Sequence, residues 1–184
     1  MDEFDHYELA YLCGGPVRVV QTAVLALSEA RRIRLSRGTH RVDVVRRESD
    51  DPVQAAVLAE IPDAGRPLGR VVEAAARTPE MDAITARLAE AGLVRPGSAR
   101  LTRGGRMIRR GLLRDGADEP SALHRLAMIG PAGVEDARLR EILESGDPKP
   151  VKLRRGRWRG HHLESSGLSD TQYSGYGDGG GAGY

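Results

Sequence analysis

The chain is poor in cysteine and aromatic residues, and each shortage excludes a class of structure. A single cysteine, Cys13, stands among 184 residues, so neither an intramolecular disulfide nor a cysteine-based zinc site can be built. A free thiol suits a reducing compartment, and the apolar neighbours of Cys13 favour a buried structural role. With one Phe, one Trp and five Tyr, the core depends on Ala, Val, Leu and Ile, which favours helices.

Long apolar runs are also missing from the sequence. No apolar run approaches the roughly 20 residues that a membrane-spanning helix needs, so no transmembrane segment is expected. The acidic start, Met1 to Asp5, differs from the basic start of a secretory signal peptide. We therefore expect a cytoplasmic protein, with peripheral association at a membrane left open.

Hydrophobic periodicity predicts a mainly α fold with short β-hairpins. Apolar residues recur at spacings of three and four in seven segments, and Gly14-Gly15-Pro16 separates the first two. Alternation predicts one hairpin over 33–44, turned at Arg37-Gly38, and a second over 93–107, turned at Pro96-Gly97. The predicted helices are 5–13, 16–32, 52–61, 67–77, 79–91, 121–128 and 136–143.

Cap residues and a buried face are predicted for the middle helices. Asp50 or Asp51 is the N-cap candidate of helix 52–61, Thr78 is that of helix 79–91, and Gly92 ends the latter. The residues of helix 79–91 that are spaced for burial are Met81, Ile84, Leu88 and Ala91.

The predicted elements form a helix-rich globular region, 1–147, and a tail, 148–184. A weak repeat relates 27–30 (LSEA) to 88–91 (LAEA), and a basic hairpin is predicted after each. This order is compatible with two winged-helix-like units, 5–47 and 50–114, followed by a helical pair, 120–144, in one domain or two. The tail has too little aliphatic content to fold, so we expect a disordered basic segment and then a disordered Gly/Tyr-rich segment.

Four sequence motifs resemble an uncharacterised actinobacterial family. They are the opening Glu8-Leu9-Ala10-Tyr11-Leu12-Cys13-Gly14-Gly15-Pro16, the helix Ala55-Ala56-Val57-Leu58, the helix end Leu88-Ala89-Glu90-Ala91-Gly92-Leu93, and Ile129-Gly130-Pro131-Ala132. The resemblance covers most of residues 7–144. Members are usually described as conserved membrane proteins with a Gly-rich C-terminus, and the family implies no catalytic residues.

This chain departs from that family in two ways. Members usually carry transmembrane segments near the middle or before the Gly-rich end, whereas here the joint from Gly111 to Pro120 is short and polar. Its tail contains tyrosine in place of cysteine. Whether the family's membrane association extends to this chain is therefore left open.

Catalytic, metal and cofactor sites are not predicted. No two of the five histidines have the i, i+4 spacing of a zinc motif, and no Gly-x-Ser-x-Gly elbow is present. Gly14-Gly15-Pro16 is not followed by the Lys-Ser/Thr of a phosphate-binding loop, so a structural turn is the better interpretation. We therefore predict that the protein is not an enzyme and needs no cofactor.

Arginine provides the candidate binding residues. An acid-free stretch carries five arginines, predicted to lie on the second hairpin and the element after it, where they would contact phosphates. A basic arm in the tail adds cations and one tryptophan able to stack on a base. The stretch contains Arg100, Arg103, Arg106, Arg109 and Arg110; the arm contains Lys152, Arg154, Arg155, Arg157, Trp158 and Arg159.

Three functions remain open at this point. The predicted one is a non-enzymatic interaction or scaffolding module with an unknown protein partner. A winged-helix-like nucleic-acid-binding protein is the first alternative, although its candidate recognition helix, Pro79 to Ala91, is acidic. Association of the basic arm with an anionic membrane surface is the second. Arginines gathered on one face away from acids would favour nucleic acid, whereas interleaved acids would indicate a solvated ion-pair surface.

Overall fold

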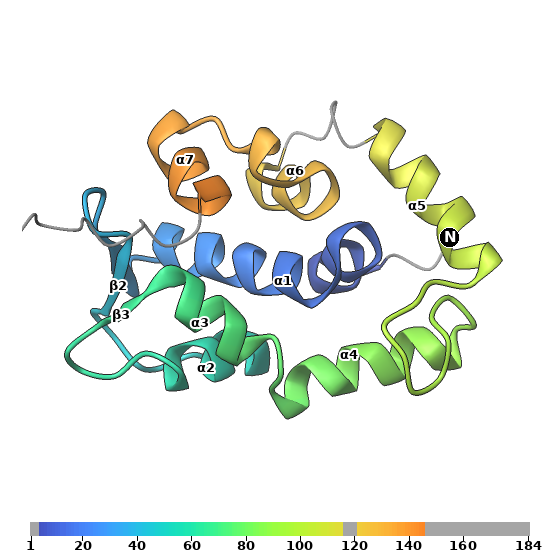
Figure 1. The fold of residues 1–184 in the computed structure, drawn as a ribbon, viewed down its shortest axis with the longest axis horizontal. Helices are drawn as coiled ribbons and strands as arrows, with labels where there is room; N and C mark the ends of the chain where they lie inside the picture. The colour runs from blue at the N-terminus through green and yellow to red at the C-terminus, as the bar shows by residue number, and fades with distance from the viewer. Residues whose placement is uncertain (1–3, 116–120, 146–184) are drawn as a thin grey trace, which may run out of the picture. The chain divides into compact units, whose positions relative to one another are not determined.

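A long central helix organises the computed structural model, which describes residues 4–115 and 121–145 (Figure 1). This helix, α1 (His6–Glu29), begins with a capping box: the Asp5 carboxylate accepts hydrogen bonds from the N–H groups of Tyr7 and Glu8, and the Glu8 side chain accepts one from the Asp5 N–H. Its buried side chains include Leu12, Val20 and Leu27. α1 is the hydrophobic axis on which the other helices pack.

α1 contains the break that the sequence predicts at Gly14-Gly15-Pro16. Gly15 has φ +71° and ψ −167°, which is outside the helical region and open to glycine far more readily than to other residues. Pro16 follows with no N–H to donate to the preceding turn. The two predicted helices, 5–13 and 16–32, are therefore the two arms of one kinked helix, which ends at Glu29.

A small antiparallel sheet follows α1. β1 (Ile33–Leu35) and β2 (Arg41–Val44) form the hairpin that alternation predicts, with Ile33 opposite Val44. β3 (Arg66–Pro67) pairs with the other edge of β2, so the sheet order is β1-β2-β3. Two residues are too few for alternation to predict this third strand.

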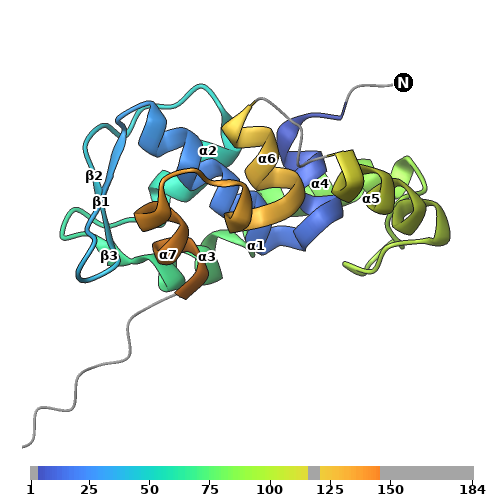
Figure 2. The same cartoon turned by 90° about the horizontal axis from the view of Figure 1, so that it is seen from above.

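Helices cover α1 from two sides (Figures 1 and 2). α2 (Pro52–Ala59), α3 (Leu68–Ala75) and α4 (Pro79–Glu90) lie on one side. α6 (Ala122–Ile129), the 3-10 turn η1 (Gly130–Gly133) and α7 (Ala137–Ser145) lie on the other, and α6 makes the most extensive contact with α1. Buried Val57, Leu88 and Leu126 join α1 in one continuous core.

The predicted N-cap residues of α2 and α4 both lie at the N-cap position, but only one of them forms a side-chain cap hydrogen bond. The Asp51 carboxylate accepts the N–H of Gln54 at the start of α2, as a side-chain cap should. Thr78 precedes α4, but its hydroxyl donates backwards to the carbonyl of Ala75 and does not cap α4. Met81, Ile84 and Leu88 are buried as predicted, whereas Ala91 is exposed because the helix ends at Glu90.

The prediction of a second hairpin over 93–107 is wrong, except that one pair of residues forms a β-bridge. Val94 and Leu101 form an isolated antiparallel bridge, and the chain then enters helix α5 (Arg103–Asp115). The glycines at 104 and 105 argue against a helix by propensity. Apolar residues at 108 and 112, with arginines on the opposite side, impose helical periodicity nevertheless.

The mainly helical fold with short β elements is confirmed, but a winged-helix arrangement is not. Only a single bridge follows α4 where a wing would need a hairpin. The β3 strand also joins the first hairpin from beyond residue 47. All described residues belong to one compact unit, Met1–Pro150.

The expectation about membrane-spanning length needs a correction. Among the described residues, α1 is the one helix long and apolar enough to cross a membrane, with an 18-residue window of mean hydropathy 1.3. Arg18 and Gln21 interrupt this stretch and hide it from a search for uninterrupted runs. Since 61% of the window is buried inside the fold, the core helix of a soluble protein would have the same signature.

Candidate anion-binding surface

The structure separates the predicted arginines into three groups. Arg103, Arg106, Arg109 and Arg110 lie on α5, not on a wing. Arg100 lies in the turn before α5, where its carbonyl accepts the N–H of Arg95. The predicted arm residues, Lys152, Arg154, Arg155, Arg157, Trp158 and Arg159, lie outside the described residues, as does the whole tail.

Thr102 fixes the direction in which α5 leaves the preceding helix. Its hydroxyl donates to the carbonyls of Gly92 and Leu93, at 2.8 and 3.2 Å, and accepts the N–H of Gly105 at 3.1 Å. One side chain thus bonds to two carbonyls just after the end of α4, of which that of Leu93 also accepts the N–H of Thr102, and to an N–H left free at the start of α5. Gly105 is buried directly against the backbone of Leu93, where a larger residue would collide.

The opposite side of α5 presents what we call the arginine face: Arg103, Arg106, Arg110 and Arg114. Their spacings of three, four and four residues place them on one side of a helix. All four are exposed, and at 1.5 Å per residue they span about 16 Å. Arg114 is absent from the predicted binding residues because the stretch was predicted as a hairpin, whereas a helical projection would have included it.

The arginine face has no acidic counterpart in the described part of the chain. Residues 91–114 contain seven arginines, Arg95, Arg100, Arg103, Arg106, Arg109, Arg110 and Arg114, and no Asp or Glu. None of these seven forms an ion pair within residues 4–115 and 121–145, where seven ion pairs are formed elsewhere. The guanidinium of Arg106 donates from Nη1 to the carbonyl of Leu101. The positive charge on this face therefore has no ion-pair partner among the described residues.

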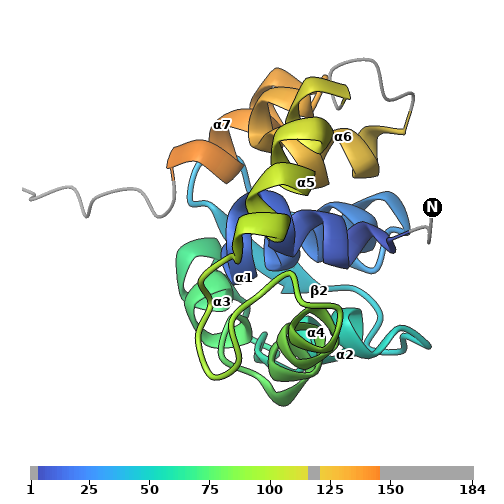
Figure 3. The same ribbon diagram turned by 90° about the vertical axis from the view of Figure 1, so that its right-hand side faces the viewer.

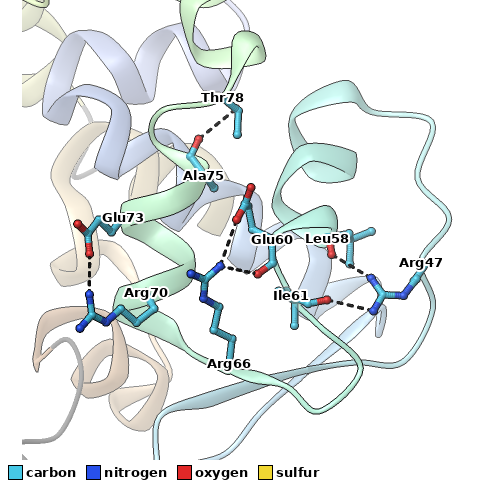
Figure 4. Close-up of polar contacts among 9 residues, drawn as sticks. All are labelled: Arg47, Leu58, Glu60, Ile61, Arg66, Arg70, Glu73, Ala75 and Thr78. Carbon is cyan, nitrogen blue, oxygen red and sulfur yellow. Dashed lines mark hydrogen bonds and ion pairs between the residues drawn. The ribbon is translucent and has the colours of Figure 1, made fainter.

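Arginines at the other end of the molecule have structural partners, as Figure 4 shows. Arg47 donates to the carbonyls of Leu58, in the last turn of α2, and of Ile61, just after the helix ends. Arg66 donates to the carbonyl and carboxylate of Glu60. These arginines cap helix C-termini, where a cation also meets the negative end of the helix dipole. A high arginine content alone is therefore no sign of anion binding in this protein.

Two large apolar side chains lie beside the arginine face. Met107 is 72% exposed and Leu113 is 40% exposed. Met107 is four residues after Arg103, and Leu113 is three residues after Arg110, so each shares a side of the helix with an arginine. Ile108 and Leu112, on the other side, are only partly buried against the core. α5 is therefore strongly amphipathic, yet apolar atoms also remain in solvent on its charged side.

Arg18 differs from the exposed arginines because its side chain lies partly inside the fold. It is half-buried, its Nη1 donates to the carbonyl of Leu126 on α6, and its buried Nε has no hydrogen-bond partner among the described residues. Burial lowers the pKa of Arg18, and Arg109 on α5 lowers it further. Burial likewise raises the pKa of the neighbouring Cys13 thiol, while Arg109 opposes this shift. The Leu126 hydrogen bond at the end of α6 explains Arg18 as a structural cap.

Besides the arginine face and Arg18, a group of polar side chains lies where α1, α2 and α6 meet. The rings of His6 and Tyr7 lie 4.0 Å apart by their centroids, and those of His6 and His124 lie 6.2 Å apart. Tyr7 Oη lies near Asp51 and Gln54, and burial raises the pKa of Tyr7. Spacing along the sequence cannot pair His6 with His124, because 118 positions separate them.

These histidines do not form a metal centre in the described structure. His6 Nε2 and His124 Nδ1 are buried without hydrogen-bond partners there. However, no group of three or more His, Cys, Asp or Glu side chains within residues 4–115 and 121–145 is placed to hold a metal ion. Desolvation lowers the pKa of His6, against the opposing effect of Asp5 and Asp51. The group is better explained as buried polar packing between helices.

A hollow between α1 and α4 offers little chemistry. It lies at the α1 kink, has a volume of about 430 Å³, and is lined mainly by small or apolar side chains such as Pro16, Met81 and Ala89. Three hydroxyls line it: the Thr85 hydroxyl donates to that of Tyr11 at 2.9 Å, and the Ser98 hydroxyl accepts the N–H of Arg100. The lining also holds the carboxylate of Asp82, but no hydrogen bond joins it to Ser98 in the described structure, so the arginine face is the stronger candidate site.

Comparisons with known proteins add no information on this site. No family model, curated protein or solved structure matches the chain. The resemblance to the actinobacterial family therefore stays a prediction from the sequence.

Proposed function

We propose that the chain is a non-enzymatic interaction module that binds a polyanionic partner through the arginine face of α5. The observation that carries this proposal is that some arginines bond to groups of the fold, whereas those of α5 have no ion-pair partner among the described residues. Arg47 and Arg66 bond to carbonyl groups of the fold, whereas Arg103, Arg110 and Arg114 present exposed guanidinium groups and form no ion pair among the described residues. A guanidinium fork matches the oxygens of a carboxylate or phosphate group.

Nucleic acid is the second candidate, supported by one specific observation. Arg103, Arg106 and Arg110 share a face away from acids in the described structure, which suits contact with phosphates. The binding mode would differ from that of a winged helix, since these arginines lie on α5 and α4 begins with acidic Glu80 and Asp82. Contacts of this kind would recognise the backbone and not the base sequence.

The test is fluorescence anisotropy of a labelled heparin oligosaccharide and of a labelled DNA duplex, titrated with the full-length chain at two salt concentrations. The variant R103Q/R106Q/R110Q should bind both probes at least about tenfold more weakly at low salt, and the difference should shrink at high salt. The matched control is R70Q/R77Q/R87Q, which loses the same charge from arginines that are ion-paired to acids.

The control separates a surface effect from a net-charge effect. If both triple variants weaken binding equally, only the total charge matters and α5 is not the binding surface. If R103Q/R106Q/R110Q binds heparin and DNA as tightly as the unmodified chain, the proposed function is wrong.

A further inference from the structure

We infer that the anion bound by the arginine face is the headgroup layer of an anionic lipid surface, on which α5 lies with its axis in the plane. This inference rests on the proposed function, because it needs the same arginines. It adds a role for two apolar side chains that charge alone leaves unexplained. It also commits to one source of phosphate, the phosphodiester of a lipid.

Exposed apolar atoms on the charged side of α5 carry the inference. Among the described residues, four large apolar side chains are markedly exposed, and two of them, Met107 and Leu113, flank the arginine face. Binding to nucleic acid through its phosphates alone would leave such flanking side chains in water. At a lipid surface, guanidinium groups meet phosphates while neighbouring apolar side chains enter the acyl boundary just beneath.

The other side of α5 keeps the helix attached to the protein. Ile108 and Leu112 pack partly buried against the core, and Thr102 holds the start of α5 against α4. Figure 3, which faces this end of the molecule, shows α5 crossing in front of α1. α5 can therefore meet a flat surface with Arg103, Met107 and Arg110 while the fold behind it stays intact.

The composition of the helix fits this mode of binding. Interfacial helices combine a strongly polar, Arg-rich side with low overall hydrophobicity and separate apolar positions. α5 carries five arginines in 13 residues, and its apolar residues are Met107, Ile108, Leu112 and Leu113. Guanidinium groups also hold phosphates through two hydrogen bonds each, which an ammonium group cannot do in the same geometry.

The experiment is co-sedimentation of the full-length chain with vesicles of pure phosphatidylcholine and of phosphatidylcholine with 30% phosphatidylserine. We expect binding only to the anionic vesicles. R103Q/R106Q/R110Q should reduce the partition coefficient by about 100-fold, since each basic residue near an anionic surface contributes about fivefold. R70Q/R77Q/R87Q is again the matched control.

A second variant, M107S/L113S, distinguishes lipid from nucleic acid. It keeps every arginine, so binding to heparin and to duplex DNA should not change. Binding to anionic vesicles should fall at least about tenfold, because two apolar side chains no longer enter the acyl boundary. Circular dichroism of the variant checks that the fold is retained.

Each remaining outcome overturns a different claim. If M107S/L113S binds anionic vesicles like the unmodified chain, the lipid inference fails and the polyanion proposal stands. If duplex DNA binds through the same arginines while the vesicles do not bind, nucleic acid is the partner and the lipid inference fails. If the arginine variant also binds heparin normally, the proposed function fails together with the inference.

Discussion

The guanidinium of Arg18 on α1 donates a hydrogen bond over 3.1 Å to the carbonyl of Leu126 on α6, 108 positions later in the chain. Gly14 and Gly130 both lie against this side chain, and a Cβ at either position would collide with it. Two of the motifs that suggest the family resemblance, one ending at Pro16 and the other containing Gly130, thus converge on one arginine. Their shared role in this chain is to lock α6 onto the kinked α1.

Replacing Gly130 with Ala should therefore destabilise the fold. Gly130 has φ +85° and ψ −159°, and a Cβ there would lie 2.5 Å from Arg18 Nη2. Backbone strain costs about 1–3 kcal/mol, and loss of a hydrogen bond from a charged group adds about 1.5–3 kcal/mol. Urea unfolding followed by circular dichroism gives the free energy of unfolding. Gly15→Ala is the control, because Gly15 has a similar conformation with no atom near its Cβ position.

A double-mutant cycle isolates the contact between Gly130 and Arg18. In an Arg18→Ala background, the Gly130→Ala penalty should fall to that of Gly15→Ala, because only backbone strain remains. An equal penalty in both backgrounds would show that the Arg18 side chain does not occupy the space next to Gly130.

Two glycines of α5 should respond in opposite directions to the same substitution. Gly105→Ala places a Cβ against the carbonyl of Leu93, so it should shift the start of α5 and lower the free energy of unfolding by about 2 kcal/mol or more. Gly111→Ala has open space and a helical position, so it should raise that energy by up to about 1 kcal/mol. Urea midpoints of the two variants decide the matter: a stable Gly105→Ala protein would mean that α5 does not pack on Leu93.

The sequence predicts the helices around α1 well because their signals are local. Apolar spacing gives α4, Asp51 gives the start of α2, and Gly14-Gly15-Pro16 gives the kink. Each of these depends on residues within about one turn of one another. The predicted α-helical class follows from the sum of such signals.

Local signals fail where tertiary contacts decide the outcome. The hairpin prediction over 93–107 follows from the turn signal at Pro96-Gly97, but packing of Ile108 and Leu112 on the core selects a helix. The approach of His6 to His124 depends on how α6 docks and has no trace in the spacing of the sequence. The arginine cluster could be predicted as a group, whereas its arrangement on one side of α5 needed the fold.

Cys13 should be nearly inert in the folded chain. The thiol is buried, and burial raises its pKa, so little thiolate is present or reachable at neutral pH. With a disulfide reagent at pH 8, the native protein should react at least about tenfold more slowly than the chain in denaturant. Equal rates in the two conditions would mean that the α1 segment around Cys13 is open to solvent.

His6 should make the fold less stable in mild acid. Desolvation lowers the pKa of His6 in the folded state, despite Asp5 and Asp51 nearby, and His124 acts in the same direction as desolvation. The unfolded chain, with a histidine pKa near 6.5, then binds a proton more readily than the folded chain. The stabilising contribution is therefore complete above about pH 6.5 and is lost as the pH falls below it.

Urea midpoints measured at pH 7.5 and pH 5.5 test this sign. Histidine is the side chain whose ordinary pKa lies within this interval, so the histidines dominate the change. The unmodified chain should lose more stability across the interval than His6→Gln, whose side chain cannot take up the proton. His40→Gln, in the turn between β1 and β2, is the control for removal of a histidine elsewhere. If His6→Gln has the same pH dependence as the unmodified chain, protonation of His6 does not oppose folding, and the buried ring must keep access to water or to an acidic partner.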